Sequence, residues 1–386
     1  MSFTIDDIAY FQEQRGVITA AGTDLALTKA TMLNDVAALR SSFGDRGRAV
    51  AELLLARRAG VGKIPAHWIA DSDSAQQATP EPVARYRAEK LRAAGVTRAF
   101  DVTCSIGTEG HALGAAGLHY VGSDLDAVRV RMARANLGAD ALLLRADALV
   151  PAVRGLGDGD VVVADPARRA GGKRITDPAQ LLPPLPALLE AWEGSECAIK
   201  CAPGIDYSEW GGLVSVVSVA GGVKETCLYS PGLGGAGRRE AVVLGAGDPY
   251  VISDRDPEIT EADSDRPLGT YLIDPDGAIV RAGLVRHYAA REGLWQLDPR
   301  IAYLTGDRIP EGTTGFRILD VVPMKKLRAA VSAWDAGSLE ILVRGIDADP
   351  DTVRKKLKLK GATPRALVLT RIGRDGVGII CEARSS

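Results

Sequence analysis

The spacing of hydrophobic and polar residues changes twice along the chain. The first ~95 residues place apolar side chains at helical intervals among strong helix formers, as in AVAELLLARR (49–58), which ends before Gly60. From Arg98 onward, short apolar runs of strand length alternate with helical stretches, a pattern typical of a parallel sheet. Beyond Pro310 the order becomes β-α-β-α-β-β. We therefore expect a helical part, an α/β part and a small second α/β part.

The apolar runs of the middle part predict a doubly wound, Rossmann-like sheet. Five runs are expected to form its parallel strands, at 99–103, 120–123, 141–145, 160–164 and 197–201. Three later runs could complete the sheet, at 213–219, 225–229 and 241–244. Helices are expected at 109–116, 126–136 and 181–192, and a helix before the sheet is expected to start at Pro80 with Thr79 as its cap.

The second half of the chain is less regular until its tail. Segment 248–266 is rich in Asp, Glu and Pro and predicts a surface connector, while Pro275-Asp276-Gly277 predicts a hairpin within 271–280. In the tail we expect strands at 316–322, 339–343, 366–372 and 377–381 and helices at 324–334 and from Asp349 to Lys360. The resulting domains are 1–95 (helical), 96–250 (α/β), 251–313 (connector region) and 314–386 (small α/β).

Composition limits the class of protein. The 386 residues are 46% apolar and 25% charged, the balance of an ordinary globular protein. No apolar run reaches the ~18–20 residues of a membrane span, and the acidic start is unlike a signal peptide. The five cysteines form no CxxC pair, which argues against a disulfide framework and a structural zinc site. We expect a soluble cytoplasmic protein that needs neither a membrane nor a metal.

The net charge of −2 conceals an asymmetry. Residues 310–386 carry 14 Lys and Arg against 9 Asp and Glu, whereas the rest of the chain carries 33 against 40. A basic C-terminal part on a mildly acidic body suits binding to a polyanion. The alternative on charge alone is a solvated surface that happens to be basic.

A possible ligand loop follows the first strand of the sheet. The sequence DVTCSIGTEG (101–110) ends a buried strand in Asp101 and continues through small residues into a helix. Such a turn, with Thr103, Ser105 and Gly107, lets the backbone approach a ligand at the carboxyl edge of the sheet. The glycines do not fit G-x-G-x-x-G, so the loop is not a dinucleotide fingerprint. A purely structural turn remains the alternative.

The next two strands also end in acidic residues. Asp124 follows the loop by about 20 positions, where a carboxylate can accept both ribose hydroxyls, and Leu125 would lie against a purine ring. Asp126 is expected to cap the next helix. Asp147 sits where it could accept an adenine amino group, with the Ala148 amide facing the ring. The alternative role for Asp124 and Asp147 is helix capping.

The fourth strand runs into Asp165-Pro166-Ala167-Arg168-Arg169. An Asp-Pro turn stiffens the chain and aims the Asp165 carboxylate and nearby carbonyls into the cleft. Asp165 and Pro166 are therefore the candidate catalytic residues that would align a base nitrogen with a donated methyl group. Arg168 and Arg169 could bind phosphate. The alternative is a rigid turn with two surface arginines.

Together these motifs resemble those of class I S-adenosylmethionine-dependent methyltransferases. More narrowly, the chain resembles the bacterial methyltransferase family with a C-terminal THUMP-like domain over most of residues 45–384. Segment QATPEPVA (77–84) matches the one that this family places ahead of its first motif, and also resembles RNA cap trimethylguanosine synthases. The resemblance implies S-adenosyl-L-methionine as cofactor, with Gln77 and Thr79 beside it and Asp101 in the first motif.

The tail carries its own resemblance. RGID (344–347), LKLKG (357–361) and LVLTR (367–371) resemble the THUMP-like domain, whose relatives bind RNA. This makes Arg354, Lys355 and Lys358 of the basic helix candidate RNA-binding residues.

The first and fourth motifs depart from the usual patterns. Thr103-x-Ser105-x-Gly107 has one of the three usual glycines, and the Asp165 motif lacks the second proline and the aromatic residue with which amino-group methyltransferases stack a flipped base. Lys200-Cys201-Ala202-Pro203 also resembles 5-methyluridine methyltransferases, in which a cysteine attacks the uracil ring. Closing a strand with a small residue is the alternative role for Cys201.

The sequence therefore predicts a Rossmann-like methyltransferase sheet with an N-terminal helical domain and a small C-terminal α/β THUMP-like domain. The predicted reaction is methyl transfer to a base of tRNA or rRNA, at a ring or exocyclic nitrogen. Three alternatives stay open: an RNA-binding protein with a degenerate methyltransferase fold, a methyltransferase for a small molecule or protein, and a 5-methyluridine-type enzyme with Cys201 as nucleophile.

Overall fold

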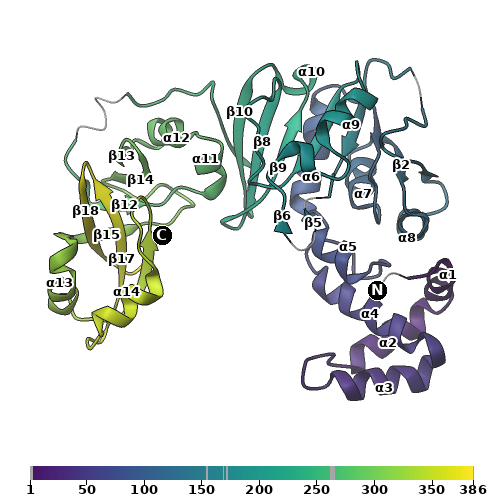
Figure 1. Cartoon of the computed structure of the whole chain (residues 1–386), viewed down its shortest axis with the longest axis horizontal. Helices are drawn as coiled ribbons and strands as arrows, with labels where there is room; N and C mark the ends of the chain where they lie inside the picture. The colour runs from purple at the N-terminus through teal and green to yellow at the C-terminus, as the bar shows by residue number, and fades with distance from the viewer. Residues whose placement is uncertain (1–2, 154, 168, 171–172, 261–265, 386) are drawn as a thin grey trace. The chain divides into compact units, whose positions relative to one another are not determined.

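A computed structural model of the protein describes residues 3–153, 155–167, 169–170, 173–260 and 266–385. The chain divides into two compact units, Met1–Arg238 with Leu244–Pro249 and Arg239–Val243 with Tyr250–Ser386 (Figure 1). No helix within the described ranges has both the length and the apolar character needed to cross a bilayer. The finer division into four domains stays a prediction.

The first unit begins with helices, as the sequence pattern predicts. They are α1 (Ile5–Glu13), α2 (Arg15–Asp24), α3 (Met32–Phe43), the short η1 (Gly44–Arg46), α4 (Gly47–Ala59) and α5 (Ser72–Gln77). Helix α1 starts at a capping box, in which the Thr4 hydroxyl accepts the Asp7 backbone N–H and the Asp7 carboxylate accepts the Thr4 N–H.

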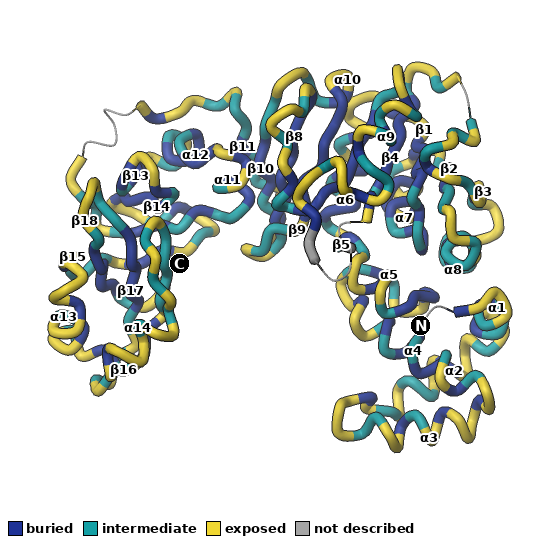
Figure 2. Tube along the Cα trace, viewed as in Figure 1, coloured by how far each residue is buried: buried dark blue, intermediate teal, exposed yellow. Residues whose placement is uncertain are grey.

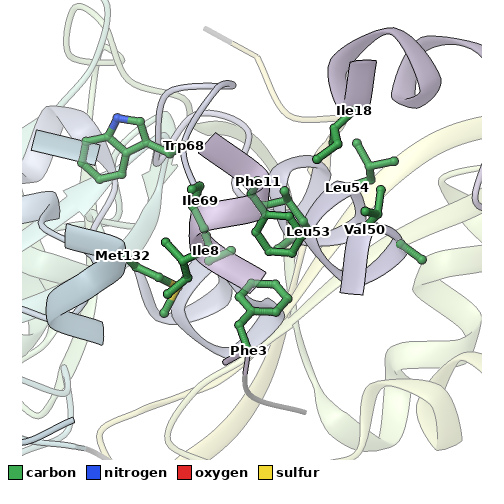
Figure 3. Close-up of a cluster of buried hydrophobic side chains, with 14 of the residues drawn as sticks. Phe3, Ile8, Phe11, Ile18, Val50, Leu53, Leu54, Trp68, Ile69 and Met132 are labelled. Atoms are coloured by element: carbon green, nitrogen blue, oxygen red, sulfur yellow. The ribbon is translucent and has the colours of Figure 1, made fainter. Parts of the chain in front are cut away.

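These helices bury one apolar cluster (Figure 3). Ile8, Phe11 and Leu53 are almost fully inaccessible to solvent within it. The cluster also takes in Ile106, from the loop after β1, and Met132, from α8. The helical region therefore shares its core with the elements around the candidate ligand loop.

A seven-stranded part of one mixed sheet forms the centre of the first unit. Its order is β8-β9-β7-β4-β1-β2-β3, with β1 (Arg98–Asp101), β2 (His119–Asp124), β3 (Leu142–Arg145), β4 (Asp160–Ala164), β7 (Cys197–Cys201), β8 (Leu213–Val219) and β9 (Gly222–Tyr229). Neighbouring pairs from β7 to β3 are parallel, and β9 runs antiparallel to both β7 and β8. The predicted strands and the Rossmann-like arrangement are confirmed.

Helices cover this sheet, so its central strands are buried (Figure 2). Every residue of β4 is buried, as expected for a parallel strand with both faces covered. Helices α6 (Glu81–Ala93) and α7 (Thr108–Ala115) share a cluster with Val161 and Val163 of β4. The remaining elements are α8 (Ala127–Leu137), α9 (Leu185–Ala191), α10 (Pro231–Gly234), η2 (Pro178–Gln180), β5 (Arg169–Ala170) and β6 (Lys173–Arg174).

The second unit holds its own sheet, in the order β13-β14-β12-β15-β18-β17-β16. Its strands and helices are β12 (Tyr271–Ile273), α11 (Gly277–Arg281), α12 (Val285–Glu292), β13 (Trp295–Asp298), β14 (Ile301–Gly306), β15 (Phe316–Pro323), η4 (Met324–Lys326), α13 (Leu327–Ala333), β16 (Ala336–Val343), α14 (Pro350–Leu357), β17 (Thr363–Ile372) and β18 (Asp375–Glu382). Strands β10 (Arg238–Leu244) and β11 (Tyr250–Ser253) pair antiparallel. The predicted β-α-β-α-β-β tail is confirmed.

Strand β17 shows how this sheet is packed on both faces. Leu367 and Leu369 join a cluster with α13 and α14, whereas Ala366 and Val368 join a second cluster with Tyr303. Side chains alternate between the two faces of a strand, so one strand supplies both clusters.

Three predictions for the second half are wrong. Segment 271–280 is not a hairpin, because the Asp276 carboxylate accepts the Ala278 N–H at 2.8 Å and caps α11, while β12 pairs with β14 and β15. The expected connector 248–266 contains β11 in its described part, whereas its residues 261–265 lie outside the described residues. The basic helix ends at Leu357, before the expected Lys360, since Lys358 adopts a left-handed φ of +50°.

Leu53→Ala is expected to lower the free energy of unfolding by about 2–5 kcal/mol, since it leaves a cavity where Leu53 is 0% exposed. Leu33→Ala is the matched control, because Leu33 is 88% exposed, and should change it by less than about 0.5 kcal/mol. Urea unfolding of both variants measures the difference. Equal effects would contradict the burial of Leu53 in this core.

Candidate active site

The parallel strands bring acidic residues to one edge of the sheet. Asp101 ends β1 and pairs in register with Gly122 of β2, and Asp124 ends β2 opposite Arg145 of β3. Asp165 directly follows β4, the other neighbour of β1. Since the carboxyl ends of parallel strands form the ligand-binding edge of open α/β folds, this is the candidate active site.

The loop after β1 has a backbone suited to a close approach by a ligand. Ser105 adopts a φ of +48° and Gly107 a φ of +93°. The positive φ favours glycine at position 107, and a Cβ there would also lie 2.9 Å from the Leu137 side chain, which would have to shift. Ser105 tolerates its conformation because its N–H donates to Asp124 at 2.9 Å and its hydroxyl accepts from Arg129 at 2.8 Å.

Asp124 is held at the end of β2 by two backbone amides. One carboxylate oxygen accepts the Ser105 N–H, and the other accepts the Asp126 N–H at 3.0 Å. The cap of α8 is Asp126, whose carboxylate accepts the Val128 N–H at 2.7 Å, as predicted. Leu125, between them, is 63% exposed. Asp124 therefore faces the edge as a fixed acceptor beside an exposed apolar side chain.

The end of β3 is connected to the end of β2. The Ala146 N–H donates to the Asp124 carbonyl at 3.1 Å. Asp147 is exposed and accepts the Leu149 N–H at 2.9 Å. Ala148 is buried, and its carbonyl accepts the Trp192 indole N–H at 2.9 Å. The predicted adenine-binding pair thus lies in a turn that Trp192 holds in place.

Asp165 is fixed through both its backbone and its side chain. Its N–H donates to the Thr103 hydroxyl at 2.6 Å, and its carboxylate lies 2.9 Å from the Lys200 ammonium. Pro166 is buried. Of the two predicted phosphate-binding arginines, Arg168 lies outside the described residues, and so does the side chain of Arg169, whose backbone begins β5.

Lys200 belongs to a row of charged side chains that we term the buried charge chain, Glu225–Arg87–Glu109–Lys200–Asp165. Arg87 of α6 hydrogen-bonds both Glu225 of β9 and, at 2.9 Å, Glu109 of α7. The Lys200 ammonium bridges Glu109 at 3.0 Å and Asp165. Each side chain except that of Asp165 is at most 5% exposed.

Sequence reasoning missed this chain, although a signal was present. Lys200 interrupts an otherwise apolar strand, Glu225 begins the buried part of β9, and Arg87 interrupts the apolar face of α6. An ionisable residue in a buried strand needs a partner, since burying an isolated charge is very costly. Arg87 and Glu225 are 138 positions apart, so the pairing itself required the fold.

The contacts within the buried charge chain determine which of its groups are ionised. Burial alone would raise the pKa of Glu109, but Arg87 and Lys200 lower it to about 2. Burial alone would lower the pKa of Lys200, but Asp165 and Glu109 hold it above its ordinary value. Both groups are therefore charged at neutral pH.

Asp101 lies beside the buried charge chain, but its pKa is raised rather than lowered. It accepts the Thr103 N–H at 3.2 Å and the Tyr120 hydroxyl at 3.0 Å. Burial, and then the nearby Glu109 charge, raise the pKa of Asp101 to about 7. The first motif thus begins with a carboxyl group that changes charge near neutral pH.

The segment ahead of the sheet places Thr79 against a cavity. Helix α6 starts at Glu81 with Pro80 as its N-cap, so the predicted capping role of Thr79 is wrong. The Thr79 side chain is buried, and its hydroxyl finds no hydrogen-bond partner among the residues that the structure describes. It lines a cavity of about 660 Å³ together with Thr108, the first residue of α7. Gln77, the last residue of α5, is exposed.

Asn136 of α8 connects the helical region to the ligand loop, a contact that the sequence did not reveal. Its amide oxygen accepts the Ile69 N–H at 2.8 Å, and its amide nitrogen donates to the carbonyls of Ile69 and Ile106, each at 3.0 Å. The segment between α4 and α5 is therefore linked through Asn136 to the loop that contains Ser105 and Gly107.

The remaining candidates lie elsewhere. Arg354, Lys355 and Lys358 belong to the second unit, where all three are exposed at α14. Cys201 is 0% exposed at the end of β7, and strand alternation turns its side chain away from the face that Lys200 occupies.

Comparisons with known proteins agree with this geometry. Residues 313–383 match the family described as THUMP domain-like. Relatives from two strains of Mycobacterium tuberculosis (CDC 1551 / Oshkosh and ATCC 25618 / H37Rv), each named as an uncharacterized S-adenosylmethionine-dependent methyltransferase, are 46% identical over 354 residues, 87% of this chain and 96% of theirs. A crystal structure from Porphyromonas gingivalis W83, of a candidate methyltransferase, shares the fold over 99% of each chain (TM-score 0.71, 17% identity).

Asp101→Asn is expected to become more stable relative to the wild type as the pH rises from about 4 to about 7. Because the folded pKa of Asp101 is raised from 3.8 to about 7, the folded wild type holds a proton that the unfolded chain releases in this window. The free energy of unfolding of the wild type therefore falls in this window, by up to about 1.4 kcal/mol per pH unit. The Asp101→Asn variant has no titrating group at this position and does not show this loss. Urea unfolding at several pH values measures the difference; a constant one would contradict the burial of Asp101.

Proposed function

We propose that this protein, which belongs to the S-adenosylmethionine-dependent methyltransferases, methylates a base nitrogen of a structured RNA, tRNA or rRNA. The observation that carries the proposal is the shared edge where Asp124 and Asp165 flank the loop 103–107. The Asp124 carboxylate suits the cofactor, and the Asp165 carboxylate suits the acceptor base.

The residues at the edge fit the adenosyl part of S-adenosyl-L-methionine. A carboxylate has about four acceptor positions, and Asp124 uses two for the amides of Ser105 and Asp126, so two hydroxyl donors of a ribose can still be accepted. The exposed Leu125 offers an apolar surface to the adenine ring, and Asp147 with Ala148 would bind its polar edge.

The methionine end would lie toward α7. Thr79, whose buried hydroxyl has no hydrogen-bond partner among the described residues, and Thr108 at the start of α7 line the same cavity. A helix N-terminus favours a carboxylate. Thr103, Ser105 and Gly107 would then pass beneath the sulfonium, with Gln77 at the rim. The protein thus places carboxylate acceptors where the ligand carries hydroxyl and amino donors.

The chain's own contribution to the reaction is alignment. The cofactor, when bound, supplies a methyl group on a cationic sulfur that leaves as a neutral thioether. Asp165 and Pro166 would hold the acceptor so that the nitrogen lone pair forms the N–C bond while the S–C pair returns to sulfur; a nitrogen proton is then released to water. Since the donor is already a strong electrophile, orientation and exclusion of water supply the catalysis.

The second unit supports the choice of RNA. Helices α13 and α14 pack on one face of its sheet through buried Leu327, Val331 and Leu357. Exposed cations lie on these two helices and on the residues next to them. We term this set the basic face: Lys325, Lys326, Arg328, Arg354, Lys355, Lys356, Lys358 and Lys360. Such a surface suits recognition of RNA by phosphate and shape rather than by sequence.

Cys201 has no part in this proposal. Its side chain is 0% exposed, and the neighbouring Lys200 ammonium is committed to Glu109 and Asp165. A base nitrogen needs no cysteine nucleophile, so a nitrogen acceptor agrees with this environment better than a 5-methyluridine mechanism does.

Asp124→Ala is expected to abolish detectable binding of S-adenosyl-L-methionine in calorimetry, because it removes the proposed ribose acceptor and frees the Ser105 amide. Asp126→Ala is the matched control two positions away. It loses the α8 cap, worth about 1 kcal/mol of stability, but should bind the cofactor normally. Unchanged binding by Asp124→Ala would contradict the proposed cofactor site.

Lys355→Ala combined with Lys358→Ala is expected to weaken RNA binding and to reduce the slope of log K against log salt by about 1.5, since each phosphate contact contributes about 0.7–0.9. Arg317→Ala is the control, because Arg317 lies on β15 and pairs with Glu382 at 3.3 Å. Filter binding of tRNA at several salt concentrations measures both. A slope unchanged by the double substitution would contradict the proposed binding of RNA by the basic face.

A further inference from the structure

The buried charge chain reaches the candidate active site at one end only. The side chains of Arg87, Glu109, Lys200 and Glu225 are 1–5% exposed, whereas that of Asp165 is 26% exposed. Figure 1 shows the elements that carry the chain, among them α6, α7 and β9. The row of charges thus runs through the interior of the first unit and ends at the edge where the acceptor would bind.

Stability alone does not account for such a chain. Removing each ion from water costs several kcal/mol, and well-packed apolar residues of similar size are often at least as stabilising. The contacts between these charged groups do fix the orientation of each side chain. Arg87 hydrogen-bonds both carboxylate oxygens of Glu109, at 2.9 and 3.1 Å, so Glu109 has little freedom. Glu109 in turn fixes the ammonium of Lys200.

Asp165 is consequently held from two sides. Lys200 holds its carboxylate at 2.9 Å, and the Thr103 hydroxyl accepts its backbone N–H at 2.6 Å. Thr103 belongs to the loop proposed to contact the cofactor, so the acceptor side and the cofactor side of the edge are set relative to each other. A displacement of about 1 Å at such a site can cost about 100-fold in rate.

We propose that Lys200 is a positioning residue, whose ammonium, oriented by Glu109, fixes the Asp165 carboxylate as a hydrogen-bond acceptor for the substrate. This inference rests on the proposed function and narrows its substrate class. An ionised carboxylate in this position accepts a hydrogen bond and cannot donate one. The acceptor nitrogen is therefore one that carries hydrogen and keeps a lone pair, as in an exocyclic amino group. The hydrogen bond to the Asp165 carboxylate orients this nitrogen so that its lone pair faces the methyl group.

The test measures methyl transfer from labelled S-adenosyl-L-methionine to RNA from a strain that lacks the gene. Lys200→Met should lower kcat by about 100-fold while the cofactor Kd from calorimetry stays within about twofold. Lys200→Arg, which keeps a cation, should have a kcat at least about tenfold higher than that of Lys200→Met. Lys90→Met is the matched control, because the Lys90 ammonium lies over the Tyr229 ring instead, and it should keep wild-type kcat.

Two further variants separate positioning from folding. Glu225→Gln weakens the far end of the buried charge chain and should lower the Tm but leave kcat within about threefold. Glu109→Gln, next to Lys200, should lower kcat, and it replaces Lys200→Met if that variant does not fold. Wild-type kcat in Lys200→Met or Glu109→Gln, or an equal loss in Glu225→Gln, would overturn the positioning role. No transfer to RNA by the wild type would instead overturn the proposed function, and this inference with it.

Discussion

The need to neutralise buried charge in the interior of the first unit is the constraint on which the rest of the structure depends. Arg87 and Lys200 lie among the carboxylates of Glu225, Glu109 and Asp165, and of these five side chains all but Asp165 are at most 5% exposed. Removing one partner from such an arrangement costs about 3–5 kcal/mol, since it leaves a buried charge unpaired. The relative positions of α6, α7, β7, β9 and the loop after β4 are therefore fixed by electrostatics as well as by packing.

A second support comes from the N-terminal helices. Their apolar cluster includes Ile106 and Met132, and Asn136 hydrogen-bonds both Ile69 and Ile106. The loop between Thr103 and Gly107 is thus braced from one side by the helical region and from the other by Asp124. A loop with a single glycine can keep its strained backbone because neighbours on both sides determine it.

Much of this architecture could be predicted from the sequence. Parallel strands read as short apolar runs, and their ends are where ligands bind, so the positions of Asp101, Asp124 and Asp165 along the chain suffice to group them. The capping role of Asp126 followed from local chemistry. By contrast, Arg87 and Glu225 pair across 138 positions, which no local pattern records. The predicted hairpin at 271–280 was wrong because an Asp-Gly pair occurs both in turns and at the start of helices. Here β12 pairs with β14, and Asp276 caps α11.

Mapping of modified nucleosides tests the account most directly. RNA from a strain that lacks the gene would be compared with RNA from its parent by mass spectrometry of nucleosides, after separation of tRNA and rRNA. The account predicts that one nucleoside methylated at a nitrogen disappears from a structured RNA and returns when the gene is restored. An unchanged set of methylated nucleosides in both RNA classes would contradict it.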